Sequence, residues 1–317
     1  MRPIARFAWG LLAYEIGVIA WGAYVRATGS GAGCGNHWPL CKGEVVPRLP
    51  SAETLIELSH RLSSGLALAL TLLLFAWARR VYPIGHRVRL GAGAVVSLMI
   101  TEALIGAVLV LFALVAHDAS LKRALGTSLH LVNTFLLLAA TSLTAWWASG
   151  GEPVRLWARG ALAPVLALSL LATLLVATSG ALTALGDTLF PSASVASGLT
   201  QDWAAGAPMY VRLRVLHPML AVATAAIVLV AMTLVRTLRC ARAVQILSRA
   251  AGVLAVAQVA LGLLDITLLA PVTMQLAHLV LADLVWIALV LTSAAAMASA
   301  PAPVSPPAFP PSRPILG

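Results

Sequence analysis

A short segment, 57–65, brings a carboxylate, an imidazole and a guanidinium together as Glu57, His60 and Arg61. Residues three and four apart share one face of a helix, so Glu57 lies on the same face as both His60 and Arg61. A histidine inside a membrane is costly and usually faces a bundle interior, a partner or a metal. The segment therefore predicts a ligand site at His60, with Glu57 as a nearby base or as the ion-pair partner of Arg61.

Three further histidines occupy positions equivalent to that of His60, namely His130, His217 and His278. His60 and His217 are 157 residues apart, and His130 and His278 are 148 residues apart, so the two separations nearly match. Each histidine follows the start of a long apolar segment by about five to eight residues, which is roughly 10 Å along a helix. We therefore expect the four imidazoles to lie at one depth, toward the outer side of a membrane.

Two imidazoles in each half of the chain are the ligands that bis-histidine heme binding inside a helical bundle requires. A zinc or copper site would instead favour three or four converging ligands that include carboxylates or thiolates. The alternative is that the histidines are polar contacts that hold helices together in lipid. Their matched positions in the two halves favour heme ligation over that alternative.

The elements that must position these histidines are long apolar segments. The chain has 317 residues, of which 60% are hydrophobic and 10% charged, and this is not a soluble globular composition. About twenty apolar residues suffice to cross a bilayer core roughly 30 Å thick. The sequence predicts eight membrane spans at 7–27, 54–78, 90–112, 123–147, 160–184, 211–236, 246–270 and 273–297.

The chain also contains an internal repeat. The segment 129–133 around His130 resembles 277–281 around His278, and the segment 101–106 resembles 257–262. Each half has an even number of spans, so the repeat is parallel. We predict an all-α membrane protein whose eight transmembrane helices form two parallel-repeat four-helix bundles. The expected units are an N-terminal half at 1–150, a C-terminal half at 151–300 and a proline-rich, disordered tail at 301–317.

The net charge of +10 reflects membrane topology rather than nucleic-acid binding, because the basic residues lie in short loops and form no basic face with interleaved aromatics. Thirteen lysines and arginines fall in one set of loops and eight in the other, which places both termini of a multi-pass cell-membrane protein in the cytoplasm. Four of the outer cations lie beside the membrane histidines and could pair with heme propionates or reach lipid headgroups: Arg26, Arg61, Arg212 and Arg214.

Cys34 and Cys41 lie in a glycine-rich loop before the second predicted span, outside the membrane, where disulfides persist. The pair could close a small loop, either as a structural staple or as a redox-active bridge. Cys240 lies among arginines on the cytoplasmic side and is expected to be a bystander thiol.

Three runs together resemble the heme A synthase family, in its cysteine-containing bacterial form: Thr28-Gly29-Ser30-Gly31, Trp38-Pro39-Leu40-Cys41 and Glu57-Leu58-Ser59-His60-Arg61. The resemblance covers nearly the whole chain, including the eight spans and the four histidines. It implies an oxidoreductase that converts a methyl group of heme O into the formyl group of heme A by successive hydroxylation. Heme A then serves terminal oxidases.

The resemblance also implies a role for each candidate residue. His60 and His130, with Arg61 and Arg26, would hold the substrate heme O. His217 and His278, with Arg212 and Arg214, would hold a permanent heme b that moves electrons. Glu57 would be the catalytic carboxylate, and Cys34 and Cys41 would form the outer-loop disulfide. The expected partners are membrane lipid, a heme O synthase and an electron acceptor that the sequence does not identify.

Two other functional classes remain open, a diheme electron-transfer cytochrome and a heme carrier. A common outward depth of the histidines speaks against electron transfer across the membrane. Among the other polar residues, Glu102 is expected to hydrogen-bond between helices or to relay protons, with Asn133 as a further hydrogen-bond partner of the site and Asp283 off the histidine face. The loop residues His37, His86 and His117 are expected to be solvated.

Overall fold

The computed structural model describes residues 2–154, 160 and 162–298. These residues form an all-helical protein in which eight helices are long and apolar enough to cross a membrane. The eight are α1 (Pro3–Ala27), α2 (Ala52–Val81), α3 (Arg87–Leu111), α4 (Leu121–Ala148), α5 (Leu162–Leu189), α7 (Met209–Leu238), α8 (Arg242–Thr267) and α9 (Val272–Ala298). Each of the eight predicted spans is confirmed as a long apolar helix, and the helix ends lie within five residues of the predicted ones.

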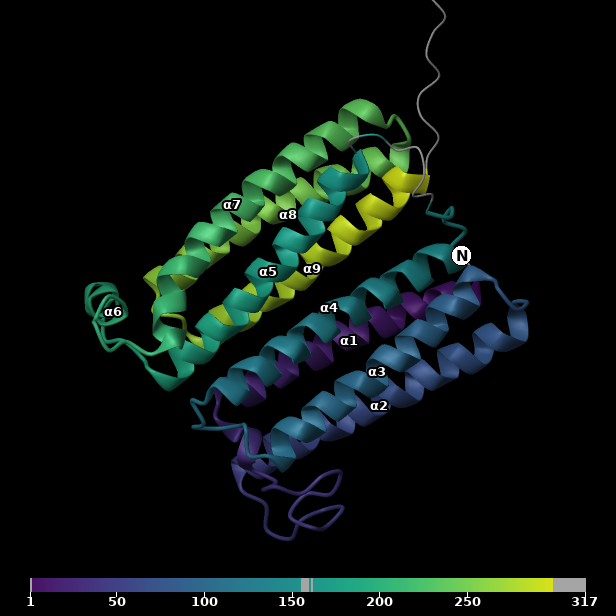
Figure 1. Cartoon of the computed structure of the whole chain (residues 1–317). Helices are drawn as coiled ribbons and strands as arrows, with labels where there is room; N and C mark the ends of the chain where they lie inside the picture. Colours follow the sequence, from purple (N-terminus) through teal and green to yellow (C-terminus); the bar gives the residue numbers. More distant parts are fainter. Residues whose placement is uncertain (1, 155–159, 161, 299–317) are drawn as a thin grey trace, which may run out of the picture.

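Two shorter elements were not predicted, the 3₁₀ turn η1 (Ser30–Ala32) and the helix α6 (Val195–Asp202). The turn η1 lies in the loop between α1 and α2, and the helix α6 lies in the loop between α5 and α7. In Figure 1 these loops lie at one end of the molecule, and the N-terminus lies at the other. The tail predicted to be disordered, 301–317, lies outside the described residues.

The starts of the long helices are fixed by local chemistry. Ser51 and Ser120 cap α2 and α4, because each hydroxyl accepts a hydrogen bond from a backbone N–H in the first turn. α1 begins with Pro3 at its first helical position, where the missing N–H costs nothing. These caps fix where α2 and α4 begin, and each of these two helices carries one of the histidines.

The long helices pack in two sets (Figure 1). In the N-terminal set, α1 to α4, α1 contacts α2 and α4, and α3 also contacts α2 and α4. In the C-terminal set, α5 and α7 to α9, α7 contacts α5 and α8, and α9 contacts α8 and α5. The sets meet through α1 and α4 on one side and α5 and α9 on the other.

The contact between the two sets is a buried apolar layer centred on Phe135 of α4 and Trp286 of α9. Their ring centroids are 5.2 Å apart, and the Trp286 indole N–H donates a 2.7 Å hydrogen bond to the Phe135 carbonyl oxygen. Because the Trp286 ring packs on Phe135 and its N–H is hydrogen-bonded to the α4 backbone, the two contacts together define the spacing and the rotation of α9 against α4. The relative position of the two sets is therefore defined by specific contacts.

Candidate functional site: four histidines against four glycines

The four histidines lie on α2, α4, α7 and α9, six to nine residues after the first residue of each helix. These helices all begin at the end of the molecule that carries η1 and α6 (Figure 1). The four imidazoles are half-buried. His60 and His130 both lie in the N-terminal set, and His217 and His278 both lie in the C-terminal set.

Each imidazole lies beside a glycine of an adjacent helix. A methyl group added to Gly22 or Gly180 would lie 2.8 Å from Cε1 of His60 or His217, and one added to Gly262 would lie 2.9 Å from Cε1 of His278. The fourth position is looser, because a methyl group on Gly106 would be 3.9 Å from Nε2 of His130. The glycines thus leave space that the rings occupy, and the same arrangement recurs in both sets.

These glycines were not predicted, although a signal for two of them was present. Gly106 and Gly262 close the similar segments 101–106 and 257–262. A glycine that ends a repeated segment next to a histidine helix indicates close approach between two elements. The sequence alone does not show which helix packs against each glycine, so it could not predict that the neighbour is a histidine.

His130 has the most elaborate polar surroundings of the four histidines. Its Nδ1 lies 2.9 Å from Oε1 of Glu102 on α3. Asn133 donates a 2.6 Å hydrogen bond to Oε2 of the same carboxylate, and Thr134 donates to Oε1. Glu102 therefore hydrogen-bonds α3 to α4 through Asn133 and Thr134, as expected, and its carboxylate also lies close to the His130 ring.

The other histidines have fewer partners. Nδ1 of His217 lies 2.9 Å from the hydroxyl of Ser179 on α5. The amide of Gln258 on α8 lies 3.1 Å from Nε2 of His278. Nδ1 of His60 is buried and has no hydrogen-bond partner among the residues that the structure describes.

Glu57 is buried, and its carboxylate joins the cysteine loop to α2. Oε2 accepts a 2.7 Å hydrogen bond from the backbone N–H of Cys34, and Oε1 is paired with Arg61. The Arg61 guanidinium also donates 2.7 Å hydrogen bonds to the carbonyl oxygens of His37 and Leu40. Within the described part of the chain, the polar contacts of Glu57 are therefore with the loop and Arg61 rather than with His60.

Cys34 and Cys41 form a disulfide in this loop. Both residues are almost fully buried, at 0% and 1% exposure. Labile, redox-active bridges are generally exposed or strained, so the burial favours the structural role of this pair. Cys240 is an exposed free cysteine.

Three of the four predicted heme-propionate arginines have their guanidinium donors engaged by the protein: Arg61, as described above, and also Arg26 and Arg214. Arg26 of α1 crosses between the sets and donates to the Ala184 carbonyl at 2.7 Å and to the Gln275 side chain at 2.8 Å. Arg214 pairs with Asp187 at 2.7 Å and with Asp202 of α6 at 3.5 Å. Arg212 is exposed, and its guanidinium donates a 3.2 Å hydrogen bond to the Ala205 carbonyl oxygen.

The Arg214 network anchors α6, which predicts a stability effect. Burial raises the pKa of the Asp202 carboxyl above its ordinary value, and the Arg214 charge opposes that rise. Replacing Arg214 by alanine leaves two carboxylates without their cation, and we expect a loss of about 3 kcal/mol in unfolding free energy. Thermal unfolding in detergent measures it. The exposed Arg249→Ala variant is the control and should stay within about 0.5 kcal/mol of the parent; equal stability of both variants would contradict the anchoring role.

The residues present fit a heme in each set. Each set has two half-buried imidazoles, and each ring lies beside a glycine of an adjacent helix. Glu102 lies close to Nδ1 of His130 and Ser179 to Nδ1 of His217, which would leave Nε2 of these two rings for a metal. The Gln258 amide would have to move from Nε2 of His278. No group of three or more histidine, cysteine, aspartate or glutamate side chains that could hold a metal ion occurs among the described residues.

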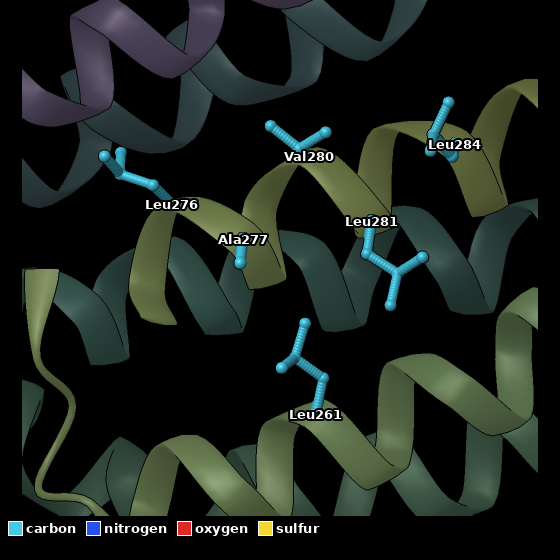
Figure 2. A pocket seen from close by; sticks show the side chains of 6 residues that line it. All are labelled: Leu261, Leu276, Ala277, Val280, Leu281 and Leu284. Carbon is cyan, nitrogen blue, oxygen red and sulfur yellow. The ribbon is translucent and has the colours of Figure 1, made fainter. Parts of the chain in front are cut away.

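An apolar pocket is lined by residues of α8 and α9. Figure 2 shows Leu261 of α8 directed toward Ala277 and Leu281 of α9. The remaining lining residues are Leu276, Val280 and Leu284. Such a surface suits the edge of a porphyrin or an acyl chain.

Comparisons with known proteins give one family and several relatives. Residues 5–290 match the model of the family COX15-CtaA, described as cytochrome oxidase assembly protein. A protein of Thermus thermophilus named protoheme IX farnesyltransferase is 50% identical over 93% of this chain, but the chain spans only 48% of that relative's length. Proteins named heme A synthase match shorter stretches. One from Geobacillus kaustophilus is 41% identical over 43% of each chain, and one from Alkalihalophilus pseudofirmus is 45% identical over 30% of this chain and 32% of its own.

Proposed function

We propose that this chain, which belongs to the COX15-CtaA family of cytochrome oxidase assembly proteins, is a heme A synthase that oxidises a methyl group of heme O to the formyl group of heme A. The observation that carries the proposal is the repeated arrangement of four histidines, two in each helical set and each beside a glycine. Relatives named heme A synthase support the same activity.

In this proposal the two helical sets are the two halves of a parallel internal repeat. His60 and His130 hold the substrate heme O in the N-terminal set, and His217 and His278 hold a resident heme b in the C-terminal set. When bound, heme supplies the one-electron chemistry at iron by which electrons are removed from a carbon–hydrogen bond. The contacts within each set and the recurring glycine–histidine pairs support this division.

The protein residues supply orientation and a proton acceptor. Glu57 is the candidate base, because each of its oxygens can accept a further bond while the Cys34 N–H and Arg61 hold the carboxylate in place. Arg212 is exposed and is therefore the arginine best placed for a heme propionate. Arg26, Arg61 and Arg214 would have to exchange protein partners before binding one.

The orientation follows from the loop charges. In the sequence, thirteen basic residues fall in the predicted inner loops and eight in the outer ones, which supports an orientation with both termini in the cytoplasm and the site open to the outer side of the cell membrane. Cysteine oxidation to a buried disulfide in the η1 loop is consistent with that side.

The remaining partners are a heme O synthase, which delivers the substrate, and an electron acceptor whose identity stays open. Thermus relatives named for transfer of a farnesyl group to protoheme IX are about twice as long as the aligned region. Their name also makes farnesyl transfer a second candidate function for this chain. The paired histidines favour oxidation over farnesyl transfer, because prenyl transfer has no use for two axial imidazoles.

Pigment extraction after co-expression tests the proposal and separates the candidates. Cells that supply heme O should accumulate a formyl heme when this chain is present. Purified chain given protoheme IX and farnesyl diphosphate should form no farnesylated heme. An unchanged heme O pool would support an electron-transfer cytochrome or a heme carrier, and a farnesylated product would support the second candidate; either result would overturn the proposal.

The glycine beside His60 provides a sharper structural prediction. In Gly22→Ala the new methyl group would lie 2.8 Å from Cε1 of His60, so the ring must shift. Loss of a residue that orients a metal ligand costs at least about tenfold in affinity, and we expect a loss of heme of that size from the N-terminal set. Gly17→Ala is the control on the same helix, because nothing lies within 4 Å of its added carbon. Heme content by absorption measures the effect, and equal content in the two variants would contradict the placement of His60.

A further inference from the structure

The two helical sets share the same histidine–glycine arrangement, but the side chains beside the histidines differ, and one difference changes the charge. Glu102 stands four residues before Gly106 on α3, and Gln258 stands four residues before Gly262 on α8. Residues four apart lie on one helical face, so each side chain lies on the same face as its glycine. A carboxylate thus faces His130 where an amide faces His278.

The surroundings of Glu102 make its carboxylate an oriented acceptor. Oε1 is 2.9 Å from Nδ1 of His130, and Asn133 and Thr134 donate to the two oxygens. An ionised carboxylate can only accept hydrogen bonds, so the proton of the His130 ring belongs on Nδ1. Nε2 would then be the nitrogen left to hold the iron of a bound heme, and the carboxylate would increase the basicity of the ring.

Gln258 cannot do the same for His278. Its amide nitrogen is 3.1 Å from Nε2 of His278 and 3.1 Å from the carbonyl oxygen of the same residue. The amide is uncharged, and no hydrogen-bond partner of its Oε1 occurs among the described residues. The C-terminal set therefore has no negative charge at the equivalent place.

We propose that Glu102 is a positioning residue that acts through His130 to lower the reduction potential of the heme in the N-terminal set below that of the heme facing Gln258. This inference rests on the proposed binding of one heme by each set. A more basic axial ligand and a nearby negative charge both stabilise the oxidised iron. One electron would then pass downhill from the N-terminal to the C-terminal set, with one iron oxidised and the other reduced, and no bond made or broken.

Potentiometric titration of the heme-loaded, full-length protein tests the inference, with absorption as the readout. Glu102→Gln should raise the potential of the N-terminal heme, so that its ratio of oxidised to reduced iron at a fixed potential falls about tenfold, or ~59 mV for one electron. The C-terminal heme should not change. The His60→Ala and His217→Ala variants identify which spectral component belongs to which set.

The reciprocal variant Gln258→Glu is the matched counterpart, and it should lower the potential of the C-terminal heme only. It also keeps the inference testable if Glu102→Gln does not fold. Glu102→Asp retains the charge and should recover part of the shift. Unchanged potentials, or equal shifts at both hemes, in a protein that still produces formyl heme would overturn this inference alone, whereas a parent protein without two histidine-bound hemes would overturn the proposed function as well.

Discussion

Replacement of His60 by alanine is expected to reduce formyl heme production by more than about 100-fold. Loss of a residue that only hydrogen-bonds a metal ligand costs up to about 100-fold, and loss of the ligand itself should cost more. The variant removes one of two imidazoles from the N-terminal set, while the disulfide loop and its contact with Glu57 remain. Extraction of the hemes from cells that supply heme O, followed by chromatography, gives the amount of product.

The control for this prediction is His117→Ala. His117 is exposed and lies in the loop between α3 and α4, outside the set of four helix histidines. Its loss should therefore leave production within about twofold of the parent. Full production by His60→Ala would remove His60 from the site. Equal losses in both variants would show that production is sensitive to any histidine change.

Glu57→Gln should produce the second large effect, a loss of about 10²- to 10⁴-fold in formyl heme formation. The amide keeps the size of the side chain and can still accept from the Cys34 N–H, but it cannot take a proton from the substrate. The rate of product formation at saturating heme O, with heme content measured in parallel, reports the effect.

A purely structural role of Glu57 has a different signature. The pair Cys34→Ser and Cys41→Ser removes the disulfide of the same loop and, from loop closure, should cost about 2 kcal/mol of stability. If Glu57 only anchors the loop, the double serine variant should lose as much activity as Glu57→Gln. A loss confined to Glu57→Gln would assign the proton transfer to this carboxylate, and full activity of Glu57→Gln would contradict that assignment.

Much of the fold could be predicted from the sequence because a membrane imposes length and apolarity on every span. The eight helices follow from runs of apolar residues, and Ser51 and Ser120 mark two of their starts. α6 escaped prediction because its eight residues carry no long apolar pattern. Its position depends on the contact between Arg214 and Asp202, which only the folded chain brings together.

The positions of the four histidines could be predicted from the sequence, but the side chains around them could not. The matched spacing of His60 with His217 and of His130 with His278 follows from the internal repeat and is visible in one sequence. The glycines beside the rings depend on which helices pack together, and so does the link between Glu102 and His130. Arg26 is the clearest case, because its partners on α5 and α9 are more than 150 residues away in the sequence.

The central claim is that four imidazoles hold two hemes, one pair in each helical set. An absorption spectrum and heme inventory of the purified protein, compared with the four single variants in which His60, His130, His217 or His278 is replaced by alanine, test it most directly. We predict two hemes per chain with bis-histidine spectra in the parent, and loss of that signature from only one heme in each variant, the same heme for the two histidines of one set. A parent that binds no heme, or variants whose spectra are indistinguishable from that of the parent, would contradict the account.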